Sequence, residues 1–440
     1  MQTLPIGNKV RRMRMSTLGL RIKERRKAIG LTQSDLAGAE LSSGMVSLIE
    51  RDMTNPSLKT LEHLAKTLEV SVNYLLNQEE AELSGTEDAG VLLRKTEGLL
   101  RVGKHEEAQK MIDELDQTHI PASLKGRYLK LQGELAIERA EYGRAIDCLN
   151  NALLYLDSSV MDEYIDTFYH LAKSHLNASA FSKSIDVAMQ GMLLLDSLPT
   201  NKNILLRLQL MYVQAYGYAR LKSYEKAMEI IEDALDYMQK TNCFYNESLF
   251  RMLNGLAALY MKDYEKGIKH TKMALALFEE NKQSEYVTGC MTNLGILLRE
   301  SGDLNQSIDY LEQSVALAEQ NDSQWNIVNS SLELATSYFR LNQWSEAKSL
   351  CERHIQKVDP EDALQVKMRL LLAQIEYEDK QYEQAKRWSD DALVIVERLE
   401  ERQLLAKTLT VHAQILIEQH QEQQAIEYLL RSNQIYENLL

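Results

Sequence analysis

The stretch Gly255-Leu-Ala-Ala-Leu-Tyr-Met-Lys-Asp-Tyr-Glu-Lys-Gly267 sets out the pattern on which most of this 440-residue chain is built. A small residue, Gly255, is followed twelve positions later by a second small residue, Gly267, and an aromatic residue, Tyr264, precedes the second one by three positions. Small side chains at these two points let two antiparallel helices approach closely, while the aromatic residue wedges the turn between them. The stretch therefore predicts a helical hairpin.

The same pattern recurs from about residue 91 to residue 440. An aromatic or bulky residue stands three positions before a small one at Tyr142, Phe181, Tyr224, Tyr264, Leu304, Trp344 and Tyr382, with weaker copies at His105 and Glu422. The upstream small residues are Gly133, Ala172, Ala215, Gly255, Gly295, Ala335, Ala373 and Ala413. The repeats are 37 to 43 residues long, and each buries its apolar face only against its neighbours. The residues at the turns, such as Tyr142, Tyr224, Tyr264, Trp344 and Tyr382, are expected in the core.

Composition supports an all-helical chain. Five prolines and 19 glycines in 440 residues are few helix breakers. This scarcity argues against an α/β enzyme with glycine-rich loops. No apolar run approaches the roughly 18 residues of a spanning helix, and the first 20 residues lack an apolar signal core. The scattered cysteines, Cys148, Cys243, Cys290 and Cys351, are expected to be free thiols, so we expect a cytoplasmic protein that does not enter a membrane.

Charge is distributed unevenly along the chain. The net charge is −14, but residues 1–78 hold 12 Lys+Arg against 7 Asp+Glu, which leaves +5. The remaining 362 residues hold 38 against 57, which leaves −19. A basic head on an acidic body favours nucleic-acid binding by the head alone.

Residues 18–78 predict five short helices. Gly30 ends the first helix, Leu18 to Ile29; Thr32 begins a capping-box-like second helix that runs to Ala37; and Ser42 caps a third helix, Ser43–Arg51. Asn55-Pro56-Ser57 breaks the chain before a fourth helix, Leu58–Leu68, and a fifth, Ser71–Leu76.

This head, with Gly30-Leu-Thr-Gln33, Ser47-Leu-Ile-Glu50 and Pro56-Ser57 in order, resembles the lambda-repressor/Cro type of helix-turn-helix. The resemblance implies that Gln33 contacts a phosphate, that the third helix enters the major groove, and that Arg26 and Glu50 form an ion pair. The turn from Ala37 to Ser42 is one residue shorter than in phage repressors, so the base-reading positions are uncertain by about one residue. Small side chains there favour readout of DNA shape. The implied DNA-binding residues are Thr32, Gln33, Ser42, Ser43, Gly44, Ser47 and Leu48.

The repeats resemble lengthened tetratricopeptide repeats, which implies a right-handed superhelical solenoid of about nine helix pairs. Joined to the head, they resemble the peptide-sensing regulators of the Rap/Rgg/NprR/PlcR/PrgX class. The domains expected are a basic leader at residues 1–17, which is a DNA-backbone arm, a disordered leader or a misassigned start; the DNA-binding domain at 18–78; a polar linker at 79–90; and the repeat domain at 91–440. The class implies that a short re-imported signalling peptide binds the concave groove and changes DNA binding.

Repeat register nominates the groove residues. Counting the upstream small residue as position eight, positions two, five, six, nine, twelve and thirteen line the concave side. Asn side chains can pair with a peptide backbone, Arg or Lys can hold a carboxylate, and Tyr offers an apolar face with a polar tip. Asn254 falls at a packing position and is left out. The basic members predict a ligand with an acidic group. The nominated residues are Arg127, Lys130, Tyr169, His170, Lys173, Tyr212, Tyr216, Arg220, Asn293, Arg299, Asn329, Thr336, Arg340 and Gln374.

Other functions remain open. The array could sequester or dephosphorylate a response regulator of a sporulation phosphorelay, as some members of the class do, or sense a ligand other than a peptide. The sequence holds none of the nucleotide, serine-hydrolase or zinc motifs, so we expect no enzyme, no cofactor and no metal; His170 and His175 lie five apart, off a shared helix face. A palindromic operator in double-stranded DNA would require a homodimer or higher homo-oligomer.

Overall fold

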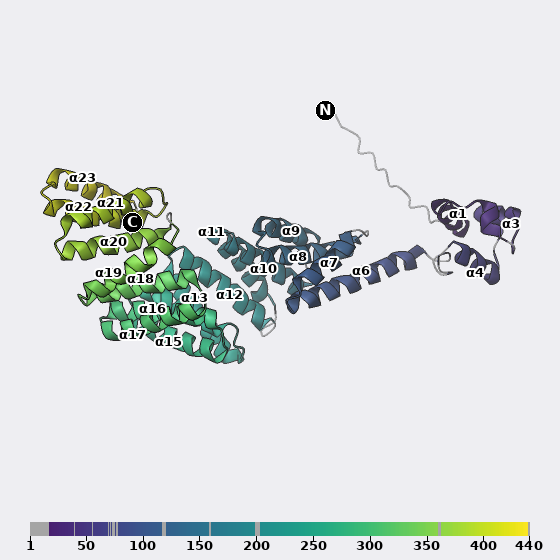
Figure 1. Ribbon diagram of the computed structural model, residues 1–440. Helices are drawn as coiled ribbons and strands as arrows, with labels where there is room; N and C mark the ends of the chain where they lie inside the picture. Colours follow the sequence, from purple (N-terminus) through teal and green to yellow (C-terminus); the bar gives the residue numbers. More distant parts are fainter. Residues whose placement is uncertain are drawn as a thin grey trace, which may run out of the picture. The chain divides into compact units, whose positions relative to one another are not determined.

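The protein is built from helices. The computed structural model describes residues 17–38, 40–54, 56–68, 70, 72, 75, 78–116, 120–157, 160–198, 203–359 and 362–438. Within these ranges it forms 22 α-helices and one short 3-10 helix, without a β-strand (Figure 1). The predicted all-α fold is therefore confirmed. No described helix is both long enough and apolar enough to cross a bilayer.

Four helices form the described part of the head: α1 (Leu18–Ala28), α2 (Gln33–Ala37), α3 (Ser43–Glu50) and α4 (Leu58–Thr67). Hydroxyl side chains cap each of them, since Thr17, Thr32, Ser42 and Ser57 accept hydrogen bonds from the first-turn amides. The apolar faces meet in a small core, whose fully buried members include Ile22, Leu36, Val46, Leu64, Leu68 and Leu75.

Two sequence predictions around residue 78 have different outcomes. Of the predicted fifth helix, Ser71–Leu76, the structure describes only Val72 and Leu75, both helical. Residues 79–90, predicted as a polar linker, are not irregular: they form the first half of α6 (Gln78–Arg101). Their polarity suggested a loop, but Glu, Ala and Leu are strong helix formers and the stretch has no proline, so helix propensity prevails. Residues 1–16 lie outside the described part of the chain.

The repeat region continues as nine consecutive helix pairs from α6 to α23. Each second helix begins at the residue that the sequence pattern marked, from His105 in α7 to Glu422 in α23. The bounds are α7 (His105–Asp116), α8 (Ala122–Glu138), α9 (Tyr142–Tyr155), α10 (Met161–Asn177), α11 (Phe181–Asp196), α12 (Ile204–Arg220), α13 (Tyr224–Thr241), α14 (Glu247–Tyr260), α15 (Tyr264–Glu280), α16 (Ser284–Ser301), α17 (Leu304–Gln320), α18 (Gln324–Arg340), α19 (Trp344–His354), η1 (Ile355–Lys357), α20 (Ala363–Glu378), α21 (Tyr382–Val396), α22 (Arg402–Glu418) and α23 (Glu422–Glu437).

The turn inside each pair has one recurring geometry. The residue two positions before each second helix adopts a positive φ: Gly103, Ala140, Ser179, Lys222, Lys262, Gly302, Asn342, Lys380 and His420. Small residues hold the two helices together, since a Cβ added to Gly255 would lie 2.0 Å from the Thr271 hydroxyl. Tyr142, Tyr224, Tyr264, Trp344 and Tyr382 are half-buried at the starts of their helices.

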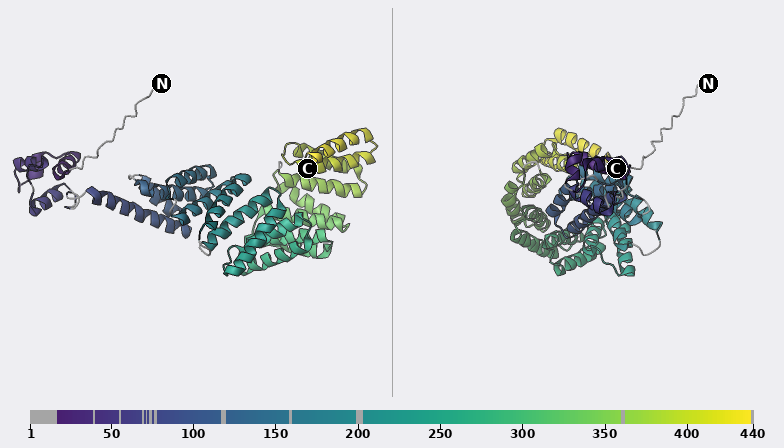
Figure 2. Two further views of the ribbon diagram at one scale, coloured as in Figure 1. Left: turned by 180° about the vertical axis from the view of Figure 1, so that it is seen from behind. Right: turned by 90° about the vertical axis from the view of Figure 1, so that its right-hand side faces the viewer.

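The chain divides into two compact units, residues 1–170 and 171–440. In the first, a core around Leu93, Ile112 and Leu131 joins α6, α7 and α8. In the second, successive cores join α12 to α23, and these helices follow one another in an arc (Figure 2). Lys222 donates a hydrogen bond of 3.1 Å to Gln403, 181 residues further along the chain. The arc of the second unit therefore brings the turn between α12 and α13 into contact with α22.

Candidate DNA interface and candidate ligand groove

Helix α3 presents one face to solvent. Val46, Ile49 and Glu50 are buried, whereas Ser43, Gly44 and Leu48 are exposed, with Leu48 at 43%. The predicted readers Thr32 and Ser42 serve as caps, since their hydroxyls accept hydrogen bonds from the amides of Asp35 and Met45. The residues of α3 that can contact DNA are therefore mainly the small ones of its first turn and Leu48.

A buried ion pair orients this helix. Arg26 on α1 contacts Glu50 at the end of α3 with two hydrogen bonds, 2.5 Å from Nε to Oε1 and 3.1 Å from Nη2 to Oε2. Gln33 on α2 donates a third hydrogen bond of 2.7 Å to the same carboxylate. Although burial alone raises the pKa of Glu50, the hydrogen bonds from Arg26 and Gln33 bring that pKa below its usual value. The three helices are thus held in one arrangement around Glu50, and Gln33 takes part in it besides its expected phosphate contact.

Sequence reasoning missed Arg51. Its guanidinium donates a 2.8 Å hydrogen bond to the hydroxyl of Ser47, so an exposed cation lies beside a predicted base-reading residue. The spacing of four residues on one helix was the signal that could have identified it. Other cations of the head serve the fold instead: Arg21 and Arg25 donate to the carbonyls of Leu75 and Leu68. The charge of +5 therefore overstates what the head offers to DNA.

In the first unit, the nominated groove cations are tied to carboxylates. Arg127 lies 2.5 Å from Glu97 and 3.5 Å from Glu163, and Lys130 is buried with its ammonium 2.5 Å from Asp166 and 3.3 Å from Glu134. With Arg101, which bonds Glu97, three cations face four carboxylates. The predicted basic character of the groove is therefore wrong for this part. Neighbouring helices α6, α8 and α10 bring their acidic residues to the cations, which the linear sequence does not show.

His170, also nominated, adjoins the same cluster. Its Nε2 lies 3.6 Å from Glu134 and 3.8 Å from Asp166, and its ring contacts that of Tyr169 at 5.0 Å. Glu134, Asp166 and His170 bring possible metal-ligating atoms within 4.8 Å of one another. However, the Lys130 ammonium already lies against both carboxylates, so the cluster carries its own cation and we assign no metal to it.

In the second unit, the nominated tyrosines pack rather than stand free. Tyr212 meets Phe250 edge-on at 5.2 Å and Tyr216 at 6.2 Å, and burial raises the pKa of the Tyr212 hydroxyl. Arg220 lies over the ring of Phe181 at 4.9 Å. Lys173 is half-buried on α10. The α12 residues therefore offer a partly covered aromatic surface.

A second charged group lies on α16 and α18. Arg299 is buried and donates to Glu300 and Glu333, and Arg340 bonds Glu300 at 2.8 Å. Desolvation lowers the pKa of Lys407, and Lys367, Arg299 and Arg340 lower it further while Glu333 opposes them. Lys407 on α22 is therefore close enough to Arg299, Arg340 and Glu333 for their charges to act on it. Thr336 donates to the carbonyl of Leu332 within its own helix.

Three nominated amides remain available. Asn293 on α16, Asn329 on α18 and Gln374 on α20 are half-buried, and none of them makes a side-chain hydrogen bond to a residue that the structure describes. Asn254, left out as a packing residue, is fully buried with neither amide atom hydrogen-bonded within the described chain. The amides are therefore the nominated groups that a ligand can still pair with.

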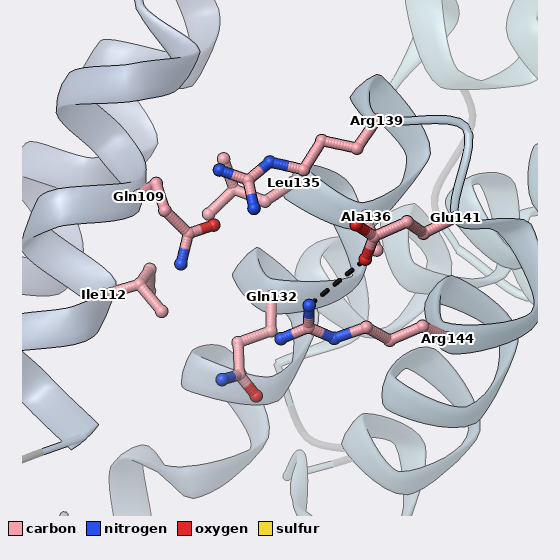
Figure 3. Close-up of a pocket in the computed structure, with 8 residues that line it drawn as sticks. All are labelled: Gln109, Ile112, Gln132, Leu135, Ala136, Arg139, Glu141 and Arg144. Carbon is pink, nitrogen blue, oxygen red and sulfur yellow. Dashed lines mark hydrogen bonds and ion pairs between the residues drawn. The ribbon is translucent and has the colours of Figure 1, made fainter.

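A hollow in the first unit does not add to the groove. It lies between α7, α8 and α9, where Arg139 and the Arg144–Glu141 ion pair surround it (Figure 3). It leaves no room for a molecule the size of water. We therefore assign it no ligand.

Sequence comparisons identify both parts of the chain. A helix-turn-helix family model matches residues 22–75, and a tetratricopeptide-repeat model matches residues 248–320. The transcriptional regulator SinR of Bacillus licheniformis is 41% identical over 86 residues, which cover 74% of SinR and 19% of this chain. The regulator DdrOP3 of Deinococcus deserti is 44% identical over 73 residues; the chain spans only 55% of its length, and the match takes 16% of this chain.

Solved structures match the fold over most of the chain. The apo form of the quorum sensor NprR from B. thuringiensis has a TM-score of 0.64 at 15% identity, covering 80% of this chain and 99% of that one. A Rap protein complexed with competence and sporulation factor has a TM-score of 0.53 at 17% identity, with coverages of 80% and 99%. The chain therefore belongs to the helix-turn-helix transcriptional regulators of XRE type, with a SinR-like DNA-binding head followed by a tetratricopeptide-repeat domain.

Proposed function

We propose that the repeat domain binds a short signalling peptide in the cytoplasm and that this binding changes how the head binds DNA. The observation that carries the proposal is a set of half-buried amides that make no side-chain hydrogen bond within the described part of the chain: Asn293, Asn329 and Gln374, on three successive first helices of the repeats. An extended peptide has unpaired N–H and C=O groups along its backbone, and each amide side chain can pair with one of each. The likeness in fold to the quorum sensor NprR supports the same assignment.

Arg340, whose side chain is 42% exposed beside Glu300, and the neighbouring Lys407 favour a peptide with an acidic residue or a free carboxylate. Because a ligand shifts an equilibrium only by its difference in affinity for two states, the peptide must prefer one curvature of the repeat array. That preference would couple peptide binding to DNA affinity, and the coupling is reciprocal.

DNA binding is tested with the full chain and the DNA beside its own gene, by fluorescence anisotropy over a range of salt concentrations. We expect affinity to fall steeply with salt, and both Gln33→Ala and Ser43→Glu to weaken binding by about tenfold or more. A glutamate at the first turn of α3 suits the helix dipole, so Ser43→Glu should leave the fold intact. Lys66→Gln on α4 lowers the net charge by one unit, as Ser43→Glu does, and serves as its control. Unchanged binding by both α2 and α3 variants would contradict the assignment of the interface.

Peptide binding is tested by searching beside the gene for a short reading frame with a secretion signal and a small C-terminal peptide. Synthetic peptides from that frame are titrated against the protein with and without DNA. We expect the peptide to shift the DNA affinity of the wild type by about fivefold or more. A peptide that binds without any change in DNA affinity would contradict the coupling, and absence of binding would favour another ligand.

We further propose that the regulator is a homodimer on a palindromic site. Helix α23 exposes Ile426 at 56% and Leu430 at 63%. Residues in register with Ile426 in earlier repeats, Ile146, Ile268 and Ile308, are half-buried, since another helix follows in the array. Sedimentation of Ile426→Asp/Leu430→Asp tests this surface: we expect a dimer for the wild type and a monomer for the variant. A variant that stays dimeric would place the interface elsewhere.

A further inference from the structure

Helix α14 begins about one turn later than its counterparts. Helices α12, α16 and α18 each start eleven residues before the small residue of their repeat, Ala215, Gly295 and Ala335. Helix α14 starts only eight residues before Gly255 and has 14 residues where the others have 17 or 18. The three missing residues amount to nearly one turn of 3.6 residues. A five-residue connection, Asn242–Asn246, replaces that turn.

An open cavity of about 420 Å³ lies at the start of α14. The connection, the start of α14, the end of α15 and the residue before α16 all contribute to it. We call it the α14 notch, and it is lined by Phe244, Asn246, Glu247, Ser248, Leu277, Asn281 and Gln283. This volume falls within the range of small-molecule sites. None of its residues belongs to the nominated peptide groove.

Ser248 marks the floor of the notch. It is 7% exposed, and its hydroxyl makes no hydrogen bond with any residue of the described ranges. In register with it, Leu208, Thr288 and Val328 occupy positions of the repeat core. The Ser248 hydroxyl is thus a polar group at a position that carries a core side chain in the neighbouring repeats, and it can form a hydrogen bond with a group bound in the notch.

The start of α14 adds donors. The Asn246 side chain makes no capping hydrogen bond, and the first amides that bond its carbonyl are those of Leu249 and Phe250. The amides of Glu247 and Ser248 thus point from an uncapped helix end, which attracts negative charge. The Glu247 carboxylate is held by Arg251 at 2.6 and 2.7 Å, so its own charge is offset within α14.

We propose that the α14 notch binds a carboxylate attached to an apolar group. Among the described residues no Lys or Arg lines the notch, so a singly charged carboxylate fits better than a phosphate. Ser248 and the first amides of α14 donate to its oxygens, the side chains of Asn281 and Gln283 complete the polar wall, and Phe244 and Leu277 receive the apolar part. Such a ligand is either a free small molecule or the C-terminus of a peptide. This site goes beyond the proposed function and does not depend on it.

The full chain is titrated by calorimetry and saturation-transfer NMR with N-acetyl-leucine and with its neutral amide, at up to about 10 mM, where a dissociation constant near 1 mM is readily measured. Acetylated Ala-Ala-Leu and its amide form a second pair, which tells a peptide end from a free small molecule. We expect at least one carboxylate to bind about tenfold more tightly than its amide.

Ser248→Val introduces the side chain that Val328 has at the same position of α18, so the variant should fold. We expect it to bind that carboxylate about tenfold more weakly. Thr288→Val, the matched change in α16, should leave the affinity unchanged. Absence of binding by both carboxylates would overturn the proposal. Equal affinity for acid and amide, or for wild type and Ser248→Val, would overturn it as well.

Discussion

Two groups of nominated groove residues differ in how their polar side chains are used. On α8 and α10 of the first unit, Lys130 and Asp166 lie in ion pairs, and Arg127 holds Glu97 and Glu163. On α16 and α18 of the second unit, Asn293 and Asn329 have no hydrogen-bond partner in the described chain. Both groups occupy similar positions in their repeats. Position in a repeat therefore selects where a side chain can stand, whereas its neighbours decide whether it is still available to a ligand.

The difference has a physical cause. A buried ammonium must be paired, because an isolated charge in the interior is very costly, so Lys130 is committed to Asp166 and Glu134. A half-buried amide keeps some contact with water, so leaving it without a hydrogen-bond partner in the protein costs less free energy. We therefore expect the first group to stabilise the fold and the second group to bind.

The largest expected effect comes from Lys130→Met. The change leaves Asp166 and Glu134 without their ammonium, and we expect a loss of about 2–3 kcal/mol in the first unit, with water at Asp166 moderating the effect. Hydrogen exchange of the amides in α8 and α10 should accelerate by roughly 30- to 150-fold while those of α16 and α18 stay unchanged. Lys110→Met on the exposed face of α7 is the control. If the amides of α8 and α10 exchanged as slowly as in the wild type, the ion pairs of Lys130 would be dispensable for stability.

The next largest effect is expected on the affinity for the signalling peptide of the proposed function. Asn293→Ala/Asn329→Ala removes two groups that can each contribute about 1 kcal/mol, so we expect affinity to fall by roughly tenfold or more. Arg127→Ala should change it less than about twofold, since that side chain is already paired. Fluorescence polarisation measures both variants. The reverse order of effects would move the binding site to the first unit.

Acid should weaken the first unit. Burial raises the pKa of Asp166, but the charges of His170 and Lys130 outweigh burial and bring that pKa below its usual value. Burial also raises the pKa of Glu97, and the hydrogen bond and charge of Arg127 bring it below its usual value. Groups with depressed folded pKa values stabilise the fold above the unfolded pKa of about 4 and lose this effect as pH falls through the folded pKa. Exchange in α8 and α10, corrected for its intrinsic rate, should therefore increase below about pH 4. Constant protection down to pH 2 would contradict the pairing.

The smallest effect is expected from Arg340→Ala. Its pair with Glu300 leaves the arginine side chain 42% exposed, and such pairs contribute less than about 1 kcal/mol. Differential scanning fluorimetry should show a midpoint within about 3 °C of the wild type. If Arg340→Ala lowered the midpoint as much as Lys130→Met does in the same assay, the charged residues of the two units would contribute equally to stability, and the comparison would fail.

Much of the fold follows from the sequence. The predicted helices Leu18–Ile29, Ser43–Arg51 and Leu58–Leu68 each end one residue beyond the observed ones, because cap residues and glycine signal helix ends locally. The helical state of residues 79–90 did not follow from their polar composition, because their helix propensity prevails over it. Repeat register alone predicts Asn293, Asn329 and Gln374, whereas the place of Arg51 beside Ser47 depends on the conformation of a long side chain, which the sequence does not specify.

The amino-acid sequence by itself determined the helix pairs and the kind of head, because small residues, aromatic residues and caps act within a few residues of one another. Only the tertiary structure decided which polar groups remain open. Arg127, Lys130 and Glu50 find their partners on other helices, and the notch at Ser248 exists because α14 lacks a turn that its neighbours have. Such pairings depend on distances between elements, and a pattern along one chain does not contain those distances.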